Sequence, residues 1–278
     1  MTNLIKMFST DQAKQFLDAN KPDSYMLIDV RQEWEYEEFH LPGAYLIPLV
    51  DLADRLDEVV TDKPVLVYCR SGGRSMAAAI LLEGQGFKDL TNMVGGVMAW
   101  QGDVAYGPME LGMAEFTGNE TPEEIVFKAY AMEESLRVFY LGRADYAETL
   151  ERIELFTELA EFEEKHKKTL FNLYGRMAGA PLSREEFERK ALQGASGAAE
   201  GGIEIEAFLE EFGGAFEGDT GMLELASMIE AQALDYYLRC AMQAESTEAK
   251  DMFQLLAREE KAHLKVLARH MVKRQGED

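Results

Sequence analysis

The sequence predicts two domains of different class, an α/β domain built on a parallel sheet followed by an all-α four-helix bundle. Its 278 residues exceed the roughly 100 to 150 of a typical single domain. The first hundred residues alternate short apolar runs with helical stretches, whereas every long segment beyond residue 121 has a helical period. We expect the first domain at residues 1–106, a linker at 107–120 and the bundle at 121–278.

Three apolar runs in the first domain are expected to be strands, at residues 25–30, 45–49 and 64–69. Helical stretches at residues 10–19 and 75–87 alternate with them. Strands that alternate with helices predict a parallel sheet that is covered by helices on both faces.

The second domain begins after a glycine-rich stretch, residues 102–121. Thr121, Pro122 and the two glutamates that follow have the pattern of an N-cap and a first helical turn. The expected helices lie at residues 122–147, 149–178, 219–244 and 247–274. The connection between the second and third helices is about forty residues long, too long for a hairpin loop. Two helical hairpins joined by one long crossover are typical of ferritin-like bundles.

The composition argues against several classes of partner. The chain has 51 acidic and 28 basic residues and a formal net charge of −23, which disfavours nucleic acid and anionic membrane surfaces. It has no apolar run of about 18 residues and no secretory pattern at its start, so we expect a cytoplasmic protein. Cys69 and Cys240 are then expected to be reduced rather than paired in a disulfide.

Cys69 lies in "YCRSGGRS", residues 68–75, between an apolar run and a helical stretch. The glycines allow successive amide groups to turn inward, and the start of a helix adds its dipole, so the stretch is expected to bind an anion. Such a pocket lowers the pKa of a thiol below about 8.5. Cys69 could therefore act as a nucleophile and carry a transferable sulfur as a persulfide.

Four stretches resemble the rhodanese family, over about residues 8–104: "LIDVR" (27–31), "HLPGAYLIPL" (40–49), "VYCRSGGRS" (67–75) and "GGVMAW" (95–100). The resemblance implies that Cys69 is the persulfide-forming nucleophile. It also implies a catalytic cradle around the sulfur, made of Arg70, Ser71, Gly72, Gly73, Arg74 and Ser75.

The rhodanese resemblance carries further expectations. Related phosphatases use a loop that is one residue longer, so the six-residue loop closed by Arg74 favours sulfur over phosphate. Asp29 and Arg31 are implied to hold nearby loops through hydrogen bonds. This chain departs from the family at Phe39, where a glycine usually precedes the histidine.

The bundle contains an internal repeat with an offset of 97 residues, which indicates a duplicated helical hairpin. The offset places these residues on one another: Glu133 on Glu230, Tyr140 on Tyr237, Ala144 on Ala241, Leu159 on Leu256, Ala160 on Ala257, Glu163 on Glu260, His166 on His263 and Leu170 on Leu267. Cys240 falls on Arg143 and lacks cationic or glycine neighbours, so we expect it to be structural.

The repeated acids and histidines predict a metal centre. Glutamate and histidine three residues apart project from one face of a helix. Four carboxylates and two imidazoles at the centre of a bundle cannot be buried unpaired, and metal ions resolve the conflict. The expected ligands are Glu133, Glu163, His166, Glu230, Glu260 and His263. Tyr140 and Tyr237 would donate hydrogen bonds to the ligand carboxylates.

Residues 122–274 resemble the rubrerythrin branch of the ferritin-like superfamily, through "AMEESLRVFY", "LAEFEEKH", "MIEAQALDYY" and "LAREEKAH". The resemblance implies two non-haem iron ions that react with peroxide or dioxygen, although manganese and zinc accept the same ligands. Ala233 stands where these proteins usually have a further glutamate. The chain has no CxxC pair for a rubredoxin iron site, so it would need an external electron donor.

These patterns together favour an enzyme, a sulfurtransferase fused to a di-iron peroxidase or oxidase. We expect thiosulfate or persulfides as sulfur donors, a thiol as acceptor, and at least a homodimer. One alternative is an iron-storage protein in which the rhodanese unit only docks a partner. Others are a non-enzymatic sensor of persulfide or iron, and a cysteine-dependent phosphatase.

Overall fold

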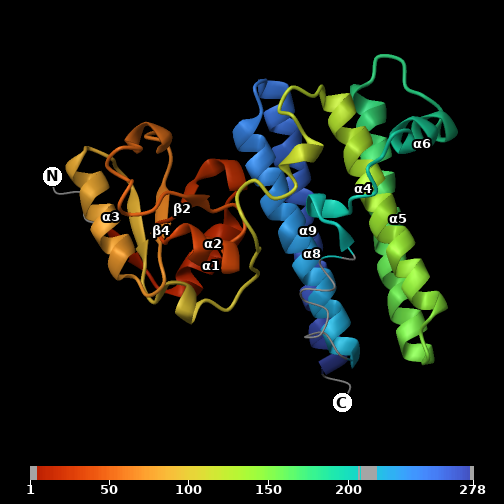
Figure 1. Ribbon diagram of the computed structural model, residues 1–278, viewed down its shortest axis with the longest axis horizontal. Helices are drawn as coiled ribbons and strands as arrows, with labels where there is room; N and C mark the ends of the chain where they lie inside the picture. The colour runs from red at the N-terminus through yellow and green to blue at the C-terminus, as the bar shows by residue number, and fades with distance from the viewer. Residues whose placement is uncertain (1–4, 206, 208–217, 276–278) are drawn as a thin grey trace. The chain divides into compact units, whose positions relative to one another are not determined.

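The computed structural model describes residues 5–205, 207 and 218–275. The chain forms two compact units, Met1–Met109 and Glu110–Asp278 (Figure 1). Within the described residues, no helix is both long and apolar enough to cross a membrane.

The first unit is built on a five-stranded sheet in which every strand pair is parallel. The strand order is β1-β5-β4-β2-β3, so β4 is the central strand. The strands are β1 (Lys6–Phe8), β2 (Met26–Asp29), β3 (Tyr45–Leu46), β4 (Val65–Tyr68) and β5 (Leu90–Met93). Cys69 follows β4 directly and therefore lies at the carboxyl edge of the sheet, where ligand sites of parallel sheets are found.

Helices cover both faces of this sheet, as the sequence predicts (Figure 1). Successive residues of a strand face opposite sides. Val67 accordingly belongs to the same apolar cluster as Leu82 of α3, whereas Leu66 belongs to the cluster that contains Ala13 of α1 and Tyr36 of α2. These helices are α1 (Thr10–Ala19), α2 (Glu33–Glu38) and α3 (Gly73–Gly84). Short 3-10 turns occur at Pro22–Ser24, Leu56–Glu58 and Gly96–Ala99.

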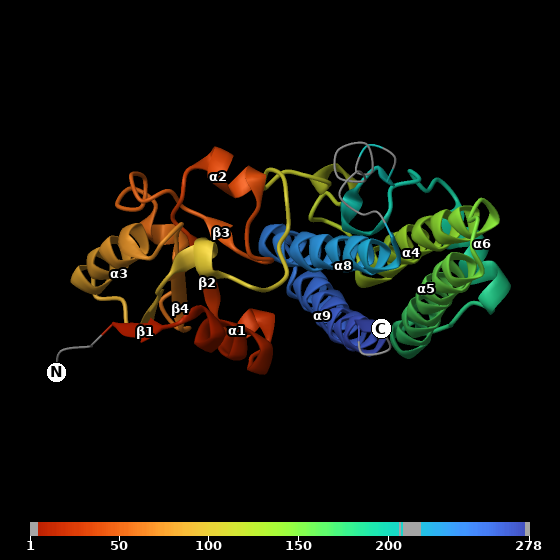
Figure 2. The ribbon, with the colours of Figure 1, turned by 90° about the horizontal axis from the view of Figure 1, so that it is seen from below.

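The second unit is a four-helix bundle made of two helical hairpins (Figure 2). The first hairpin is α4 (Pro122–Asp145) and α5 (Leu150–Met177), and the second is α8 (Gly218–Gln243) and α9 (Thr247–Gln275). The expected cap at Thr121 is present, because its hydroxyl accepts a hydrogen bond from the Glu124 amide. The connection between α5 and α8 contains one further described helix, α6 (Arg184–Leu192).

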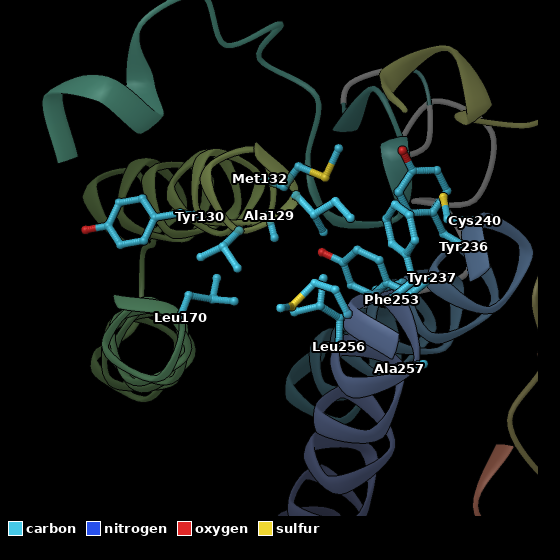
Figure 3. Close-up of a cluster of buried hydrophobic side chains, with 14 of the residues drawn as sticks. Ala129, Tyr130, Met132, Leu170, Tyr236, Tyr237, Cys240, Phe253, Leu256 and Ala257 are labelled. Carbon is cyan, nitrogen blue, oxygen red and sulfur yellow. The ribbon is translucent and has the colours of Figure 1, made fainter. Parts of the chain in front are cut away.

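Two apolar clusters fill the bundle interior. One contains Tyr130 and Leu170 of the first hairpin and Tyr237 and Phe253 of the second, and these side chains are drawn in Figure 3. The other contains Leu136, Leu155 and Leu159 from the first hairpin together with Leu223, Ile229 and Leu267 from the second. Each expected metal ligand falls between the two clusters along its helix, in a polar layer near the middle of the bundle.

Residues that precede α4 contribute to the same core. Phe116 is 3% exposed, and its ring lies edge-on to that of Phe253 with centroids 4.9 Å apart. The end of the stretch expected as a linker therefore packs on the bundle.

Candidate functional site

The sulfur of Cys69 is enclosed by the loop that leads from β4 into α3. The Gly72 amide donates a hydrogen bond to Cys69 Sγ over 3.1 Å, and the Ser75 hydroxyl donates another over 3.4 Å. Gly72 has a φ of 102°, in the left-handed region that favours glycine, and it caps α3. The conformation of the loop thus directs an amide and a hydroxyl at the thiol.

These donors determine the ionisation of Cys69. Burial acts to raise the pKa of this thiol. Hydrogen bonds from the Ser75 hydroxyl and from the amides of Ser75, Ser71 and Gly72 outweigh burial, so the pKa is lowered. The thiolate, which is the nucleophilic form, is therefore favoured at this position.

A second loop braces the cysteine loop from outside. The amides of Val97 and Met98 donate hydrogen bonds to the carbonyl groups of Cys69 and Arg70, each over 3.0 Å. Gly96 makes this approach possible, because a Cβ atom there would lie 2.2 Å from the Cys69 carbonyl oxygen. This close approach gives Gly96 a structural role in the "GGVMAW" stretch. The resemblance alone assigned no role to its glycines.

Arg74 closes the loop and is held by a residue that the sequence analysis missed. Both Arg74 terminal nitrogens donate to Glu35 of α2, over 2.6 and 2.7 Å. This two-pronged pair lowers the pKa of the Glu35 carboxyl, because the Arg74 guanidinium stabilises its charged form. Glu35 also caps the start of α2, where its side chain accepts a hydrogen bond from the Gln32 amide, and that local position does not point to the cysteine loop.

The other members of the predicted cradle differ in their exposure. Arg70, Ser71 and Gly73 are exposed, whereas Ser75 is fully buried. The cysteine itself is 1% exposed, so the loop offers charged and polar groups at the surface around a covered sulfur.

Asp29 and Arg31 form the loop-holding bonds that the sequence predicts. Arg31 Nε donates to Asp29 Oδ2 over 2.8 Å, and Arg31 Nη2 donates to the Phe39 carbonyl over 2.6 Å. Phe39 has a φ of −172°, which is extended backbone that any residue can adopt. The phenylalanine in place of glycine therefore causes no backbone strain here.

The bundle brings the six expected metal ligands together. Glu133 of α4, Glu230 of α8, and Glu163 and Glu260 of α5 and α9 are all buried. His166 Nδ1 lies 3.0 Å from Glu163 Oε2 and 3.2 Å from Glu133 Oε2.

The second hairpin repeats this arrangement. His263 Nδ1 lies 2.8 Å from Glu260 Oε2 and 3.5 Å from Glu230 Oε2. The ring of His263 stacks on that of His166, with centroids 3.4 Å apart. The two halves of the centre are thus related as the sequence repeat predicts.

The chemistry of this donor set fits metal ions. Two triads have ligand atoms within 4.8 Å of one another: Glu133 with Glu163 and His166, and His166 with Glu230 and His263. Among the described residues, the buried Oε2 atoms of Glu163 and Glu230 have no donor near them other than the imidazoles of His166 and His263, which lie 3.0 and 3.5 Å away. Buried carboxylate oxygens with so few donors are costly, and a cation would satisfy both.

The electrostatics of the protein alone show how strongly these groups interact. Burial acts to lower the pKa of His166, but the carboxylates of Glu133 and Glu163 outweigh it and raise the pKa well above its usual value. Burial acts to raise the pKa of Glu230, but the hydrogen bond with His263 and the charge of His166 lower it. The charged form of Glu230 is therefore favoured, and a buried carboxylate requires a positive partner.

Tyr140 and Tyr237 are each 1% exposed and lie in opposite apolar clusters of the bundle. Ala233 is fully buried in the cluster that contains Tyr237. An alanine side chain has no atom that can bind a metal ion, so this position supplies no ligand. Burial raises the pKa of Cys240 to about 12, which keeps that thiol protonated and supports the structural role expected for it.

A small cavity of about 40 Å³ adjoins the ligands. Four of them line it: Glu163, His166, Glu230 and His263. Its other walls are apolar and are formed by Leu159, Phe162, Ala226, Val266 and Leu267. The arrangement can bring a small molecule next to the carboxylates and imidazoles.

Comparisons with known proteins agree with both halves of this description. The model of the rhodanese-like domain matches residues 9–103, and the model of rubrerythrin matches residues 221–278. The second match lies on α8 and α9.

Curated relatives match the first unit. The putative sulfurtransferase YtwF of Bacillus subtilis is 38% identical over 99 residues, which are 36% of this chain and 93% of that protein. The putative sulfur carrier protein YrkF of the same organism is 37% identical over 98 residues, 35% of this chain and 52% of that protein, so the chain spans about half its length. The thiosulfate sulfurtransferase GlpE of Pseudomonas syringae is 37% identical over 83 residues, 30% of this chain and 78% of that protein.

Among solved structures, a rhodanese-like domain protein from Staphylococcus aureus is 29% identical and covers 37% of this chain and 98% of its own, with a TM-score of 0.34. The chain belongs to the rhodanese-like family through its first unit, and a rubrerythrin domain follows in the same polypeptide.

Proposed function

We propose that the first unit is a sulfurtransferase that works through a persulfide on Cys69, and that the bundle holds two non-haem iron ions that react with hydrogen peroxide or dioxygen. The observation that carries the first half is the pair of hydrogen bonds from Gly72 and Ser75 to the sulfur. The observation that carries the second is the buried layer of four carboxylates and two imidazoles.

The sulfur transfer proceeds in two displacements. The Cys69 thiolate attacks the outer sulfur of thiosulfate, a new S–S bond forms, and sulfite leaves with the electron pair of the broken bond. An acceptor thiolate then attacks the outer sulfur of the persulfide and releases Cys69 as thiolate. No net oxidation occurs in either step.

The residues of the loop have separate tasks in this reaction. The amides of Ser71 and Gly72 and the Ser75 hydroxyl stabilise negative charge on sulfur. Arg70 and Arg74 place two cationic groups at the loop surface, where an anionic donor would approach. Glu35 positions Arg74 through its two-pronged contact.

In the bundle, Glu133, Glu163 and His166 would hold one iron ion. Glu230, Glu260 and His263, which contact one another in the second hairpin, would hold the other. The iron pair, when bound, supplies two electrons to reduce peroxide to water. The protein excludes bulk water with the apolar clusters on both sides of the ligand layer. An external reductant must restore the electrons, because the chain has no CxxC pair.

Persulfide chemistry and a thiol acceptor suit a reducing compartment, so we place this function in the cytoplasm. We also propose that the protein acts as a homodimer, which sedimentation of the full chain would test.

A thiosulfate assay with a thiol acceptor tests the sulfurtransferase half. Full-length protein should release sulfite, and Cys69→Ser should not. Sulfur transfer that persists in Cys69→Ser would refute the proposed nucleophile, and hydrolysis of an aryl phosphate in its place would indicate a phosphatase.

Metal analysis of protein purified without oxygen tests the other half. We expect about two iron ions per chain and consumption of hydrogen peroxide by the reduced protein. A content well above two would support iron storage. If the purified protein is folded but contains no metal, the proposed centre is refuted.

A further inference from the structure

Two partly exposed apolar side chains, Phe162 and Val266, line the cavity beside the ligand layer. The deeper apolar walls, Leu159, Ala226 and Leu267, are buried. We propose that Phe162 and Val266 form an apolar throat through which small oxidants reach the metal centre, and that this throat excludes bulky hydroperoxides. The inference rests on the proposed function of the bundle.

The helix spacing places both residues over the imidazoles. Phe162 precedes His166 by four residues on α5, and Val266 follows His263 by three on α9. Residues three or four apart lie on one face of a helix. Phe162 and Val266 therefore share a helix face with His166 and His263, respectively, and the cavity that they line also contacts Glu163 and Glu230.

The size of the cavity sets the class of molecule that it admits. Its volume of about 40 Å³ is a few times the minimum of roughly 10 to 15 Å³ that holds one water molecule. Hydrogen peroxide and dioxygen are small enough for such a space. An aryl hydroperoxide or an organic persulfide can enter only if the walls move.

The Phe162 ring has a contact that fixes its position. The Lys165 ammonium lies 4.6 Å from the centroid of this ring. A cation above an aromatic face is attracted to it, and this contact restrains the ring at the cavity entrance.

The internal repeat does not preserve Phe162 and Val266, and this difference supports a specialised role for the two residues. With the offset of 97 residues, Phe162 falls on Glu259 and Val266 falls on Thr169. The proposed ligands are glutamate or histidine in both halves, and the inner leucine positions are leucine in both halves. The throat residues, in contrast, have polar counterparts. The equivalent positions therefore provide matched controls.

Azide binding to the iron-loaded, oxidised full-length protein tests the throat without requiring turnover. Azide is a small probe whose binding to ferric iron is followed by absorbance. We expect Phe162→Trp and Val266→Phe to slow its association by about tenfold, which corresponds to about 1.4 kcal/mol in a barrier. Phe162→Ala should speed it, and Thr169→Phe, at the counterpart of Val266, should leave it unchanged.

A second measurement compares hydrogen peroxide with cumene hydroperoxide as oxidants of the reduced protein. Wild-type protein should discriminate strongly against the bulky oxidant, and Phe162→Ala should reduce this preference by about tenfold or more. Iron content and circular dichroism establish that each variant is folded and loaded.

The outcomes separate the throat from the function on which it rests. A chain that holds no iron refutes both. An iron-loaded chain in which all three throat variants bind azide at the wild-type rate, or in which Thr169→Phe slows binding as much as Val266→Phe, refutes the throat alone.

Discussion

The imidazole rings of His166 and His263 lie face to face, with centroids 3.4 Å apart and planes 4° apart. The two residues are equivalent in the internal repeat, so the stack marks the point where the two hairpins meet. Two charged imidazolium rings at this separation would repel each other. A ring that binds a metal ion carries no extra proton, so the stacked pair is compatible with the proposed metal centre.

Removal of either histidine should weaken metal binding. We expect His166→Ala and His263→Ala each to lower the metal content, because each ring lies against carboxylates of the ligand layer. Metal content per chain after dialysis measures this. Lys168→Ala, an exposed neighbour on α5, is the control and should keep full content.

The two cysteines should behave oppositely. Cys69 has a lowered pKa, whereas burial raises that of Cys240 to about 12. Cys69→Ser should therefore abolish sulfur transfer, and Cys240→Ser should retain it with at most a modest loss of stability, about 1 kcal/mol. Thiosulfate turnover and thermal unfolding of both variants separate the two effects. Equal activity losses would contradict the assignment.

The reactivity of Cys69 should depend on pH with a midpoint below the usual thiol range. The lowered pKa means that the thiolate persists as pH falls, until pH passes through that pKa and the thiol forms. The rate of alkylation by iodoacetamide, measured against pH on Cys240→Ser protein, reports the midpoint. Ser75→Ala removes one donor to the sulfur and should move the midpoint upward. An unchanged midpoint would mean that the Ser75 hydroxyl does not stabilise the thiolate.

The sequence was sufficient to predict the layers of the fold but not all of its elements. The α4 and α5 helices agree with their predicted ranges within about two residues, because caps and period coincide at their ends. The sequence does not predict β5, because the polar residues Thr91 and Asn92 interrupt its apolar run, although both are buried. The β1 strand has three residues, too few for a periodic signal.

The candidate sites, like the fold, contain some features that the sequence predicts and others that it does not. Repetition of Glu163 and His166 at Glu260 and His263 reveals the ligand layer, because two equal spacings at one offset are improbable by chance. Nothing in the sequence links Glu35 to Arg74, which is 39 residues away, since their contact depends on how α2 lies beside the loop. Tertiary contacts of this kind carry no local period or motif.

Glu35→Gln should weaken sulfur transfer without removing it. The substitution keeps the size of the side chain but removes the charge that binds Arg74 at two points. We expect KM for thiosulfate to rise several-fold with a smaller change in kcat, because Arg74 would lose its fixed position. Glu33→Gln, an exposed neighbour on α2, should leave both constants unchanged. A fall in kcat alone would argue that Glu35 acts in the chemical step instead.

Gly96→Ala should disrupt the cysteine loop from a position that does not contact the sulfur. An added Cβ would lie 2.2 Å from the Cys69 carbonyl oxygen and 2.5 Å from the Arg70 backbone, and the φ of 55° disfavours alanine as well. We expect the first unit to lose at least about 2 kcal/mol of stability and most of its thiosulfate turnover.

The control for this prediction is Gly84→Ala. Gly84 ends α3, and an added Cβ there would contact no atom within 4 Å. Alanine is the better helix former, so this variant should keep full turnover and gain up to about 1 kcal/mol. Chemical unfolding and turnover of both variants give the comparison. The Val97 and Met98 amides reach the cysteine loop only while Gly96 allows the close approach. If Gly96→Ala matched wild-type protein in stability and in turnover, these two hydrogen bonds would not be needed to hold the loop.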